Sequence, residues 1–238
     1  QLKKRFSDLT FFSADLPVQI HHAAQHGTFP MAYCDLTFNE TNGEIESLHV
    51  LNSRWDIAPI LPPLRILSLE PDRVPSQEAP KFIRIDSAGL RPQRIPLSDR
   101  SKIIPALNRI IETVDPDLIL THYGDNWLFP LLLELETELG KANNAAEPDE
   151  QSLKINRDPE RKLRWKKETS YFSYGQVIYR GQEAHLFGRC HLDIKNTLMW
   201  KEYGLDGTFE TARVTALPIE QAARSSPGSG ISAMQILT

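Results

Sequence analysis

Residues 115–132 read DPDLILTHYGDNWLFPLL, and this stretch predicts a buried strand that runs directly into a helix. The apolar run at 117–121 lies between an Asp-Pro pair and a Tyr-Gly-Asp-Asn turn, which is typical of a central strand covered on both faces. Asp125 and Asn126 are suited to cap a helix that starts at Trp127. The stretch therefore places one strand and one helix at the centre of an α/β fold.

A second predicted strand ends in two carboxylates. Residues 62–72 read PPLRILSLEPD, so Glu70 and Asp72 close an apolar run. Two strand ends that present acids at one edge of a sheet are the minimum for holding a divalent metal, because Mg²⁺ prefers hard oxygen ligands. Glu70 and Asp72 are therefore candidate metal ligands.

The composition is that of a globular protein, and it weakens several other classes. The chain has 238 residues, 40% of them apolar, and carries a net charge of −4, so nucleic-acid binding must rely on local basic patches. Its apolar runs are far shorter than the roughly 20 residues of a membrane span, and we expect a cytoplasmic protein without a membrane partner. Cys34 and Cys190 lack metal-binding spacing and are expected to be reduced, packed thiols. The first residue is not Met and the last residues are helix-like, so we expect an excised piece of a longer protein.

The N-terminal segment predicts a small β-rich unit. Residues 31–38 and 44–51 alternate in hydrophobicity and are joined by a turn containing Asn-Gly, which indicates a hairpin. His21 and His22 are interpreted as histidines of a solvated segment rather than as a metal site, because adjacent side chains point apart. The Pro-rich stretch 58–63 marks a boundary.

The rest of the chain predicts a mixed sheet with at least one crossover, since strands are followed by a helix and then another strand. In chain order, the further predicted elements are strands at 64–69, 81–85 and 94–97, a helix at 99–114 capped by Ser98, a helix at 127–139 ending at Gly140, a hairpin of 176–179 with 184–187 around Gly181-Gln182, a strand at 189–194 reaching Asp193, and a helix through 200–203.

A basic segment follows an acidic stretch at 141–151. Such a charge run is typical of a solvated face. Alternatively it supplies phosphate contacts, with Trp165, Tyr171, Phe172 and Tyr174 as base-stacking platforms. The candidate nucleic-acid-binding residues are Lys154, Arg157, Arg161, Lys162, Arg164, Lys166 and Lys167.

Taken together, these segments resemble motifs of family B DNA polymerases. Residues 62–72 resemble the first exonuclease motif, in which an apolar strand ends in Asp-x-Glu. Residues 115–132 resemble the second, in which Asp-Pro-Asp and an apolar strand lead to an aromatic-Asp pair and a Pro-aromatic-Leu close. The segment GRCHLDIKNTLMWKEYGLDGTFETARVTALPI at 188–219 is similar to the one that follows in these proteins, and the last stretch resembles the start of the polymerase palm.

The resemblance covers most of 60–238 and implies a ribonuclease H-like α/β fold, a mixed sheet flanked by helices, with a small β-rich N-terminal unit. Together with the N-terminal hairpin pattern, it leads us to expect three domains. These are the β-rich unit at 1–60, an exonuclease-like domain at 61–215, and the start of a truncated polymerase region at 216–238.

Departures from the family pattern bear on activity, because the family nuclease uses four carboxylates to hold two metal ions. Glu70 falls on the family's Asp and Asp72 on its Glu, so this pair is swapped. Leu128 falls on the Asp of the second motif, and Asp125, one helical turn earlier, is either a substitute ligand or a helix cap. The third motif, Tyr-x-x-x-Asp, has no counterpart, and Asp193 is either a further ligand or a cap.

We therefore expect an exonuclease-like domain of a family B-type DNA polymerase, impaired or inactive as a nuclease. It is expected to bind single-stranded or template DNA and to support the polymerase domain downstream in the same chain, in DNA replication or repair. One alternative is an active proofreading 3′-to-5′ exonuclease that uses Glu70, Asp72, Asp125 and, as a further candidate, Asp193, with Mg²⁺ or Mn²⁺ held by the first two. An inactive domain needs no cofactor. The other alternative is a protein-interaction module of a repair complex.

Overall fold

The computed structural model of the chain describes residues 18–142, 152–173, 176–198 and 200–225. It groups into two compact units, one of Pro62–Trp200 and one that combines Gln1–Leu61 with Lys201–Thr238. The domain limits predicted from the sequence stay predictions. The acidic residues of 143–151, Tyr174 and the palm-like stretch after 225 lie outside the described residues.

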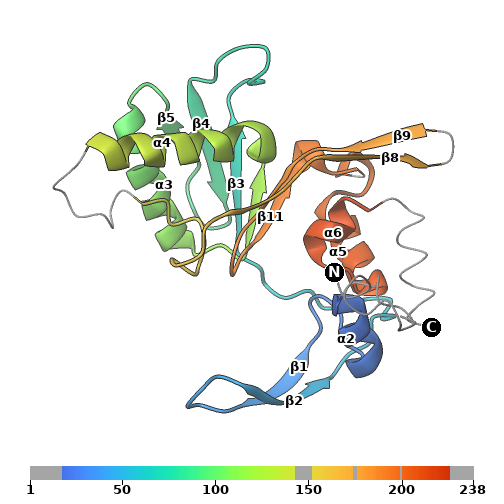
Figure 1. The fold of residues 1–238 in the computed structure, drawn as a ribbon. Coiled ribbons are helices and arrows are strands. Elements are labelled where there is room, and N and C mark those ends of the chain that lie inside the picture. Colours follow the sequence, from blue (N-terminus) through green and yellow to red (C-terminus); the bar gives the residue numbers. More distant parts are fainter. Residues whose placement is uncertain (1–17, 143–151, 174–175, 199, 226–238) are drawn as a thin grey trace, which may run out of the picture. The chain divides into compact units, whose positions relative to one another are not determined.

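A mixed five-stranded sheet forms the centre of the larger unit (Figure 1). Its strands lie in the order β11-β6-β3-β4-β5, with β3, β6 and β11 parallel and β4 antiparallel to both β3 and β5. This arrangement confirms the predicted α/β class with a mixed sheet and a crossover. The strands are β3 (Ile66–Pro71), β4 (Phe82–Ser87), β5 (Gln93–Pro96), β6 (Leu118–Thr121) and β11 (Cys190–Asp193).

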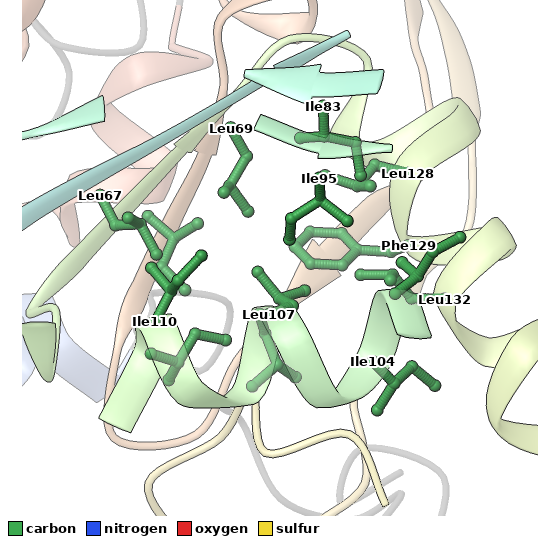
Figure 2. Close-up of a cluster of buried hydrophobic side chains, with 14 of the residues drawn as sticks. Leu67, Leu69, Ile83, Ile95, Ile104, Leu107, Ile110, Leu128, Phe129 and Leu132 are labelled. Carbon is green, nitrogen blue, oxygen red and sulfur yellow. The ribbon is translucent and has the colours of Figure 1, made fainter. Parts of the chain in front are cut away.

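Helices α3 (Arg100–Val114) and α4 (Phe129–Ala142) pack against the sheet through one apolar core. Alternate residues of β3, such as Leu67 and Leu69, point into this core, and Figure 2 shows them facing Leu107 of α3. Burying each such side chain stabilises the fold by roughly 1.5–3 kcal/mol. The opposite side of β3, β4 and β5, which we call the open face, carries Ser68, Glu70, Phe82, Arg84, Asp86 and Arg94.

The two helices begin differently from the sequence prediction. The N-cap of α3 is Asp99 rather than Ser98, and its carboxylate accepts from the Ser101 hydroxyl instead of a backbone amide. Residues 124–128 form a π-helical turn, η1, so α4 begins at Phe129 and continues past Gly140. The reason lies in Tyr123, which takes a left-handed conformation and whose carbonyl accepts from the amide of Leu128, five residues on.

Residues 164–173 and 176–185 form a long antiparallel ribbon, and this corrects the predicted second hairpin. Strand β9 (Gln176–Arg180) pairs with β8 (Thr169–Ser173), and β10 (Glu183–His185) pairs with β7 (Arg164–Lys166). Both pairs keep one register, so Gly181 lies within the returning side of the ribbon rather than at a hairpin turn. Pairing with an earlier strand therefore overrides the local turn signal of a single glycine.

The smaller unit contains the predicted N-terminal hairpin, β1 (Cys34–Phe38) with β2 (Ile45–Val50), which is confirmed. Its helices are α2 (Val18–His26), α5 (Trp200–Thr215) and α6 (Ile219–Ala223), and a small core joins Ile20, Ala212, Leu217 and Ala222. His21 and His22 are exposed on α2, as expected of a solvated segment. None of the helices in the described ranges is long and apolar enough to cross a membrane.

Candidate functional site

The three parallel strands end side by side, and their carboxyl ends form what we call the carboxyl edge of the sheet. Leu69 of β3, Thr121 of β6 and Asp193 of β11 lie in register across this edge. Glu70 and Asp72 close β3, and Asp125 lies in the turn after β6. The four carboxylates predicted from the sequence as candidate ligands therefore come to the same edge of the sheet.

Glu70 lies on the open face and pairs with a histidine that the sequence prediction did not include. Its Oε1 is 3.1 Å from His122 Nδ1, and the Glu70 side chain is 39% exposed. Burial lowers the pKa of His122, and the negative charge of Glu70 opposes that effect. Glu70 is thus held by a protein partner, although part of its carboxylate still faces solvent.

Asp72 closes the loop between β3 and β4. Its Oδ1 accepts from the backbone amides of Lys81, at 2.7 Å, and Phe82, at 3.2 Å, while its Oδ2 accepts from Arg73 Nε at 3.0 Å. Burial favours the protonated acid, but these three donors outweigh it and lower the pKa of Asp72. Both oxygens of this carboxylate are therefore bound to the protein.

Asp125 is fully buried and holds the base of the ribbon rather than capping α4. Its Oδ1 accepts from the amide of Ala184 at 2.8 Å, and its Oδ2 accepts from Asn196 Nδ2 at 2.7 Å. Its carbonyl accepts from Gln182 Nε2 at 2.7 Å. The prediction that Asp125 and Asn126 cap a helix is wrong, because η1 begins at Gly124 and the Asp125 carboxylate turns toward the ribbon.

Gly124 lets this turn approach the sheet closely. A Cβ at this position would lie 2.0 Å from Thr121 Oγ1 and 2.9 Å from His191 Nε2. These two buried side chains bond each other at 2.9 Å, and His191 Nδ1 lies 2.9 Å from the carbonyl oxygen of Ala184. The turn, the strand end and the ribbon are therefore joined by a buried polar network.

Asp193 is fully buried and organises the same edge from β11. Its carboxylate accepts from the backbone amides of Tyr123, Asp125 and Lys195, each at 3.0 Å. Burial raises the pKa of Asp193 to about 6, against the opposing effect of these donors. Of its two predicted roles, the capping contacts are present, since the Lys195 bond caps the short 3₁₀ turn η2 (Ile194–Asn196).

Leu128 stands where the family resemblance places a metal-binding aspartate. Its side chain is fully buried in the apolar core, beside Phe129 (Figure 2). In the ranges that the structure describes, no group of three or more His, Cys, Asp or Glu side chains is arranged to hold a metal ion. Because the oxygens of Asp72, Asp125 and Asp193 are bonded to protein donors, the residues present do not fit a two-metal site. Catalytic roles for these carboxylates stay a prediction.

Cationic side chains also gather at the carboxyl edge, and the sequence prediction missed them. Lys195 lies over the Tyr123 ring, at 5.8 Å from its centroid, and Arg84 and Arg94 are exposed on the open face. A signal for them was present in the sequence. Lys195 follows the strand-end Asp193 by two residues, and Arg84 is an exposed position of the alternating strand 82–87.

The predicted basic segment divides into bonded and solvent-facing side chains. Arg157 bonds Asp117 at 2.6 Å and Asp115 at 3.0 Å, so it fastens the segment to the sheet. The other bonded pairs are Lys154 with Glu112, Lys166 with Glu183, and Arg161 with Asp158. Among the described residues, Lys162, Arg164 and Lys167 are exposed without a carboxylate within 4 Å.

Comparison with known proteins identifies a likeness in structure rather than in sequence. No protein-family model matches the chain, and no curated protein matches it in sequence. The fold is similar to the family B DNA polymerase from the hyperthermophilic archaeon Pyrobaculum calidifontis, with a TM-score of 0.60 and 16% identity. The match covers 95% of this chain and 36% of that one, so the chain spans little more than a third of the polymerase's length.

Proposed function

We propose that the chain is an exonuclease-like domain of a family B-type DNA-directed DNA polymerase, impaired or inactive as a nuclease. Its role is to bind single-stranded or template DNA and to support the polymerase domain of the same protein in DNA replication or repair. The likeness in fold to the Pyrobaculum polymerase supports this assignment. So does the order of the two motif-like segments, which lie on the neighbouring strands β3 and β6.

The burial of Leu128 in the core carries the proposal that nuclease activity is impaired. A two-metal mechanism needs several carboxylates that share two cations between the attacking and leaving oxygens. Asp125 and Asp193 have no exposed surface, and Asp72 has both oxygens bonded, so an intact ligand set would require breaking these contacts. Glu70 alone supplies too few ligands for two metal ions.

The test of the nuclease assignment is incubation with an end-labelled single strand and Mg²⁺ or Mn²⁺, alongside an active 3′-to-5′ exonuclease. The expected result is an intact strand with this chain and a shortened one with the control enzyme. Metal-dependent shortening that disappears in Glu70→Ala and Asp72→Ala would establish the active-exonuclease alternative instead.

The binding role is supported by the solvent-facing cations of the basic segment. Each phosphate contact made by Lys or Arg releases counterions, so affinity for a single strand falls with salt, with a slope of about 0.7 per contact on logarithmic axes. We expect the double variant Arg164→Ala with Lys167→Ala to reduce this slope by about 1.4. The matched control is Lys102→Ala with Arg109→Ala on α3, which removes the same charge from exposed positions. A slope equal to the control would exclude the basic segment from DNA binding.

A further inference from the structure

The open face and the carboxyl edge meet at a cavity of about 360 Å³ that holds opposed charges. Ser68, Glu70, Arg84, Asp86 and Arg94 line it. Glu70 is taken by His122, whereas Arg84 and Arg94 have no carboxylate within ion-pair distance among the described residues. The cavity therefore offers two guanidinium groups without an ion-pair partner, next to the carboxylates of Glu70 and Asp86.

Arg84 and Arg94 lie directly opposite each other on the neighbouring strands β4 and β5. Like charges in that position destabilise an antiparallel pair, by an amount comparable to the 0.2–1 kcal/mol that opposite charges contribute. Arg94 is fixed on this face because its guanidinium lies over the Phe82 ring, at 4.7 Å from the centroid. Two arginines held side by side against their mutual repulsion form a pair that an anion would stabilise.

Lys195 adds a third cation outside the cavity, from the turn η2 after β11, and β6 lies between β11 and β3. It is exposed, lies over the Tyr123 ring, and has no carboxylate partner within ion-pair distance in the described chain. Its charge and that of Arg84 both act on His122, so both cations lie near that histidine. Tyr123 has a positive φ of 63°, an uncommon conformation for a residue other than glycine that is often associated with functional sites.

We propose that Arg84, Arg94 and Lys195 bind phosphates of the backbone of single-stranded nucleic acid along the edge of the sheet that carries the four candidate metal ligands. The fixed cations take the place of the metal charge, so binding needs no divalent ion. Guanidinium groups suit this role, because their paired N–H donors match phosphate oxygens. The inference rests on the proposed DNA-binding function and adds a second contact region to the basic segment.

The test compares the salt dependence of binding in the presence of EDTA. Fluorescence anisotropy with a labelled oligothymidine single strand measures the affinity of the full chain and of Arg84→Ala with Lys195→Ala. We expect roughly tenfold weaker binding and a slope reduced by about 1.4, with less than about twofold change in the control Lys102→Ala with Arg109→Ala. All four positions are exposed, so circular dichroism is expected to show unchanged folds.

The variant Glu70→Gln distinguishes a phosphate-binding site from a metal site, because the two predict opposite changes in affinity for the single strand. Removing this negative charge is expected to tighten binding by about two- to threefold, because it no longer offsets the cations. A metal ligand would show the reverse, with binding that depends on Mn²⁺ and weakens in Glu70→Gln.

The outcomes distinguish this inference from the proposed function. If the chain binds DNA and Arg84→Ala with Lys195→Ala behaves like the control, the inference fails while binding through the basic segment stands. If binding requires a divalent ion, the inference also fails, and the result supports a metal site at this edge instead. If the unmodified chain does not bind a single strand with or without metal, the inference and the proposed function fail together.

Discussion

Both ends of the parallel strands carry carboxylates and cations, but the two groups pair with each other mainly at one end. At the amino edge, before β3 and β6, Asp115 and Asp117 are bonded to the arginines Arg65, Arg157 and Arg189 in one closed network. At the carboxyl edge, carboxylates bond mainly to backbone amides and the cations face solvent. Paired charges hold the amino edge together, whereas Arg84 and Lys195 at the carboxyl edge have no carboxylate within ion-pair distance among the described residues and are available for a ligand.

The largest expected effect tests whether close packing holds the carboxyl edge. Gly124→Ala is expected to reduce the free energy of unfolding by about 3 kcal/mol or more, because the added Cβ meets the buried Thr121 side chain at 2.0 Å. Urea denaturation measures the change. The matched control is Gly140→Ala, where a Cβ meets nothing within 4 Å and helix propensity favours alanine by up to about 1 kcal/mol. Equal stabilities for the two variants would contradict the packing account.

The two edges are also expected to respond oppositely to pH. The pKa of Asp193 rises to about 6 on folding, so the folded state binds its proton more tightly and stability falls as pH rises from about 4 to above 6. Over this range the free energy of unfolding is expected to fall by on the order of 2–3 kcal/mol. At the amino edge, the Arg65 hydrogen bond lowers the pKa of Asp117, so its contribution is present at neutral pH and is lost below about 4.

Denaturation at a series of pH values measures both limbs of this profile. Asp193→Asn is expected to flatten the decline between about pH 4 and 6, while the acid limb from Asp117 remains. A decline of the same steepness in Asp193→Asn would assign it to another group.

A smaller effect tests the closed network of the amino edge. Asp117→Ala is expected to reduce the free energy of unfolding by about 1–2 kcal/mol, since it removes acceptors for the Arg65 amide and for two guanidinium groups. Glu134→Ala, which breaks an exposed pair with Arg100, is expected to cost less than about 0.5 kcal/mol. Thermal unfolding measured by circular dichroism distinguishes them, and a neutral Asp117→Ala would show that the network is only a surface feature.

The smallest expected effect on stability is at Glu70. Because the Glu70 side chain is more than a third exposed, Glu70→Gln is expected to change the free energy of unfolding by less than about 0.5 kcal/mol. The same urea titration measures it. A large loss would assign Glu70 a structural role like that of Asp72.

The sequence was sufficient for the parts of the fold that depend on local chemistry. Strand 118–121 and the N-terminal hairpin follow from apolar runs and turn residues within a few positions. The predicted pairing of the ribbon is wrong because its register is set by a partner strand and by Trp165 packing on the core. Asp125 was misassigned for a related reason, since its acceptor role depends on Ala184, 59 residues away.

The same limit applies to the candidate site. Its acids are predictable because each one lies at a strand end or in the turn that follows, but the bonds that occupy them are not. The sequence does not single out Arg84 and Lys195, because one exposed charge on a strand or just after it is ordinary. Only the parallel pairing of β3, β6 and β11 brings Lys195, His122 and Glu70 to one edge.

The most direct test of the central claim is the affinity for a labelled single strand measured first in EDTA and then in Mn²⁺, with the strand length checked afterwards. The claim is that fixed cations, rather than metal ions, bind phosphate at the carboxyl edge. It predicts the same dissociation constant within about twofold in both conditions, with the strand intact. Binding that appears only with Mn²⁺, or a strand that is shortened in its presence, would contradict it.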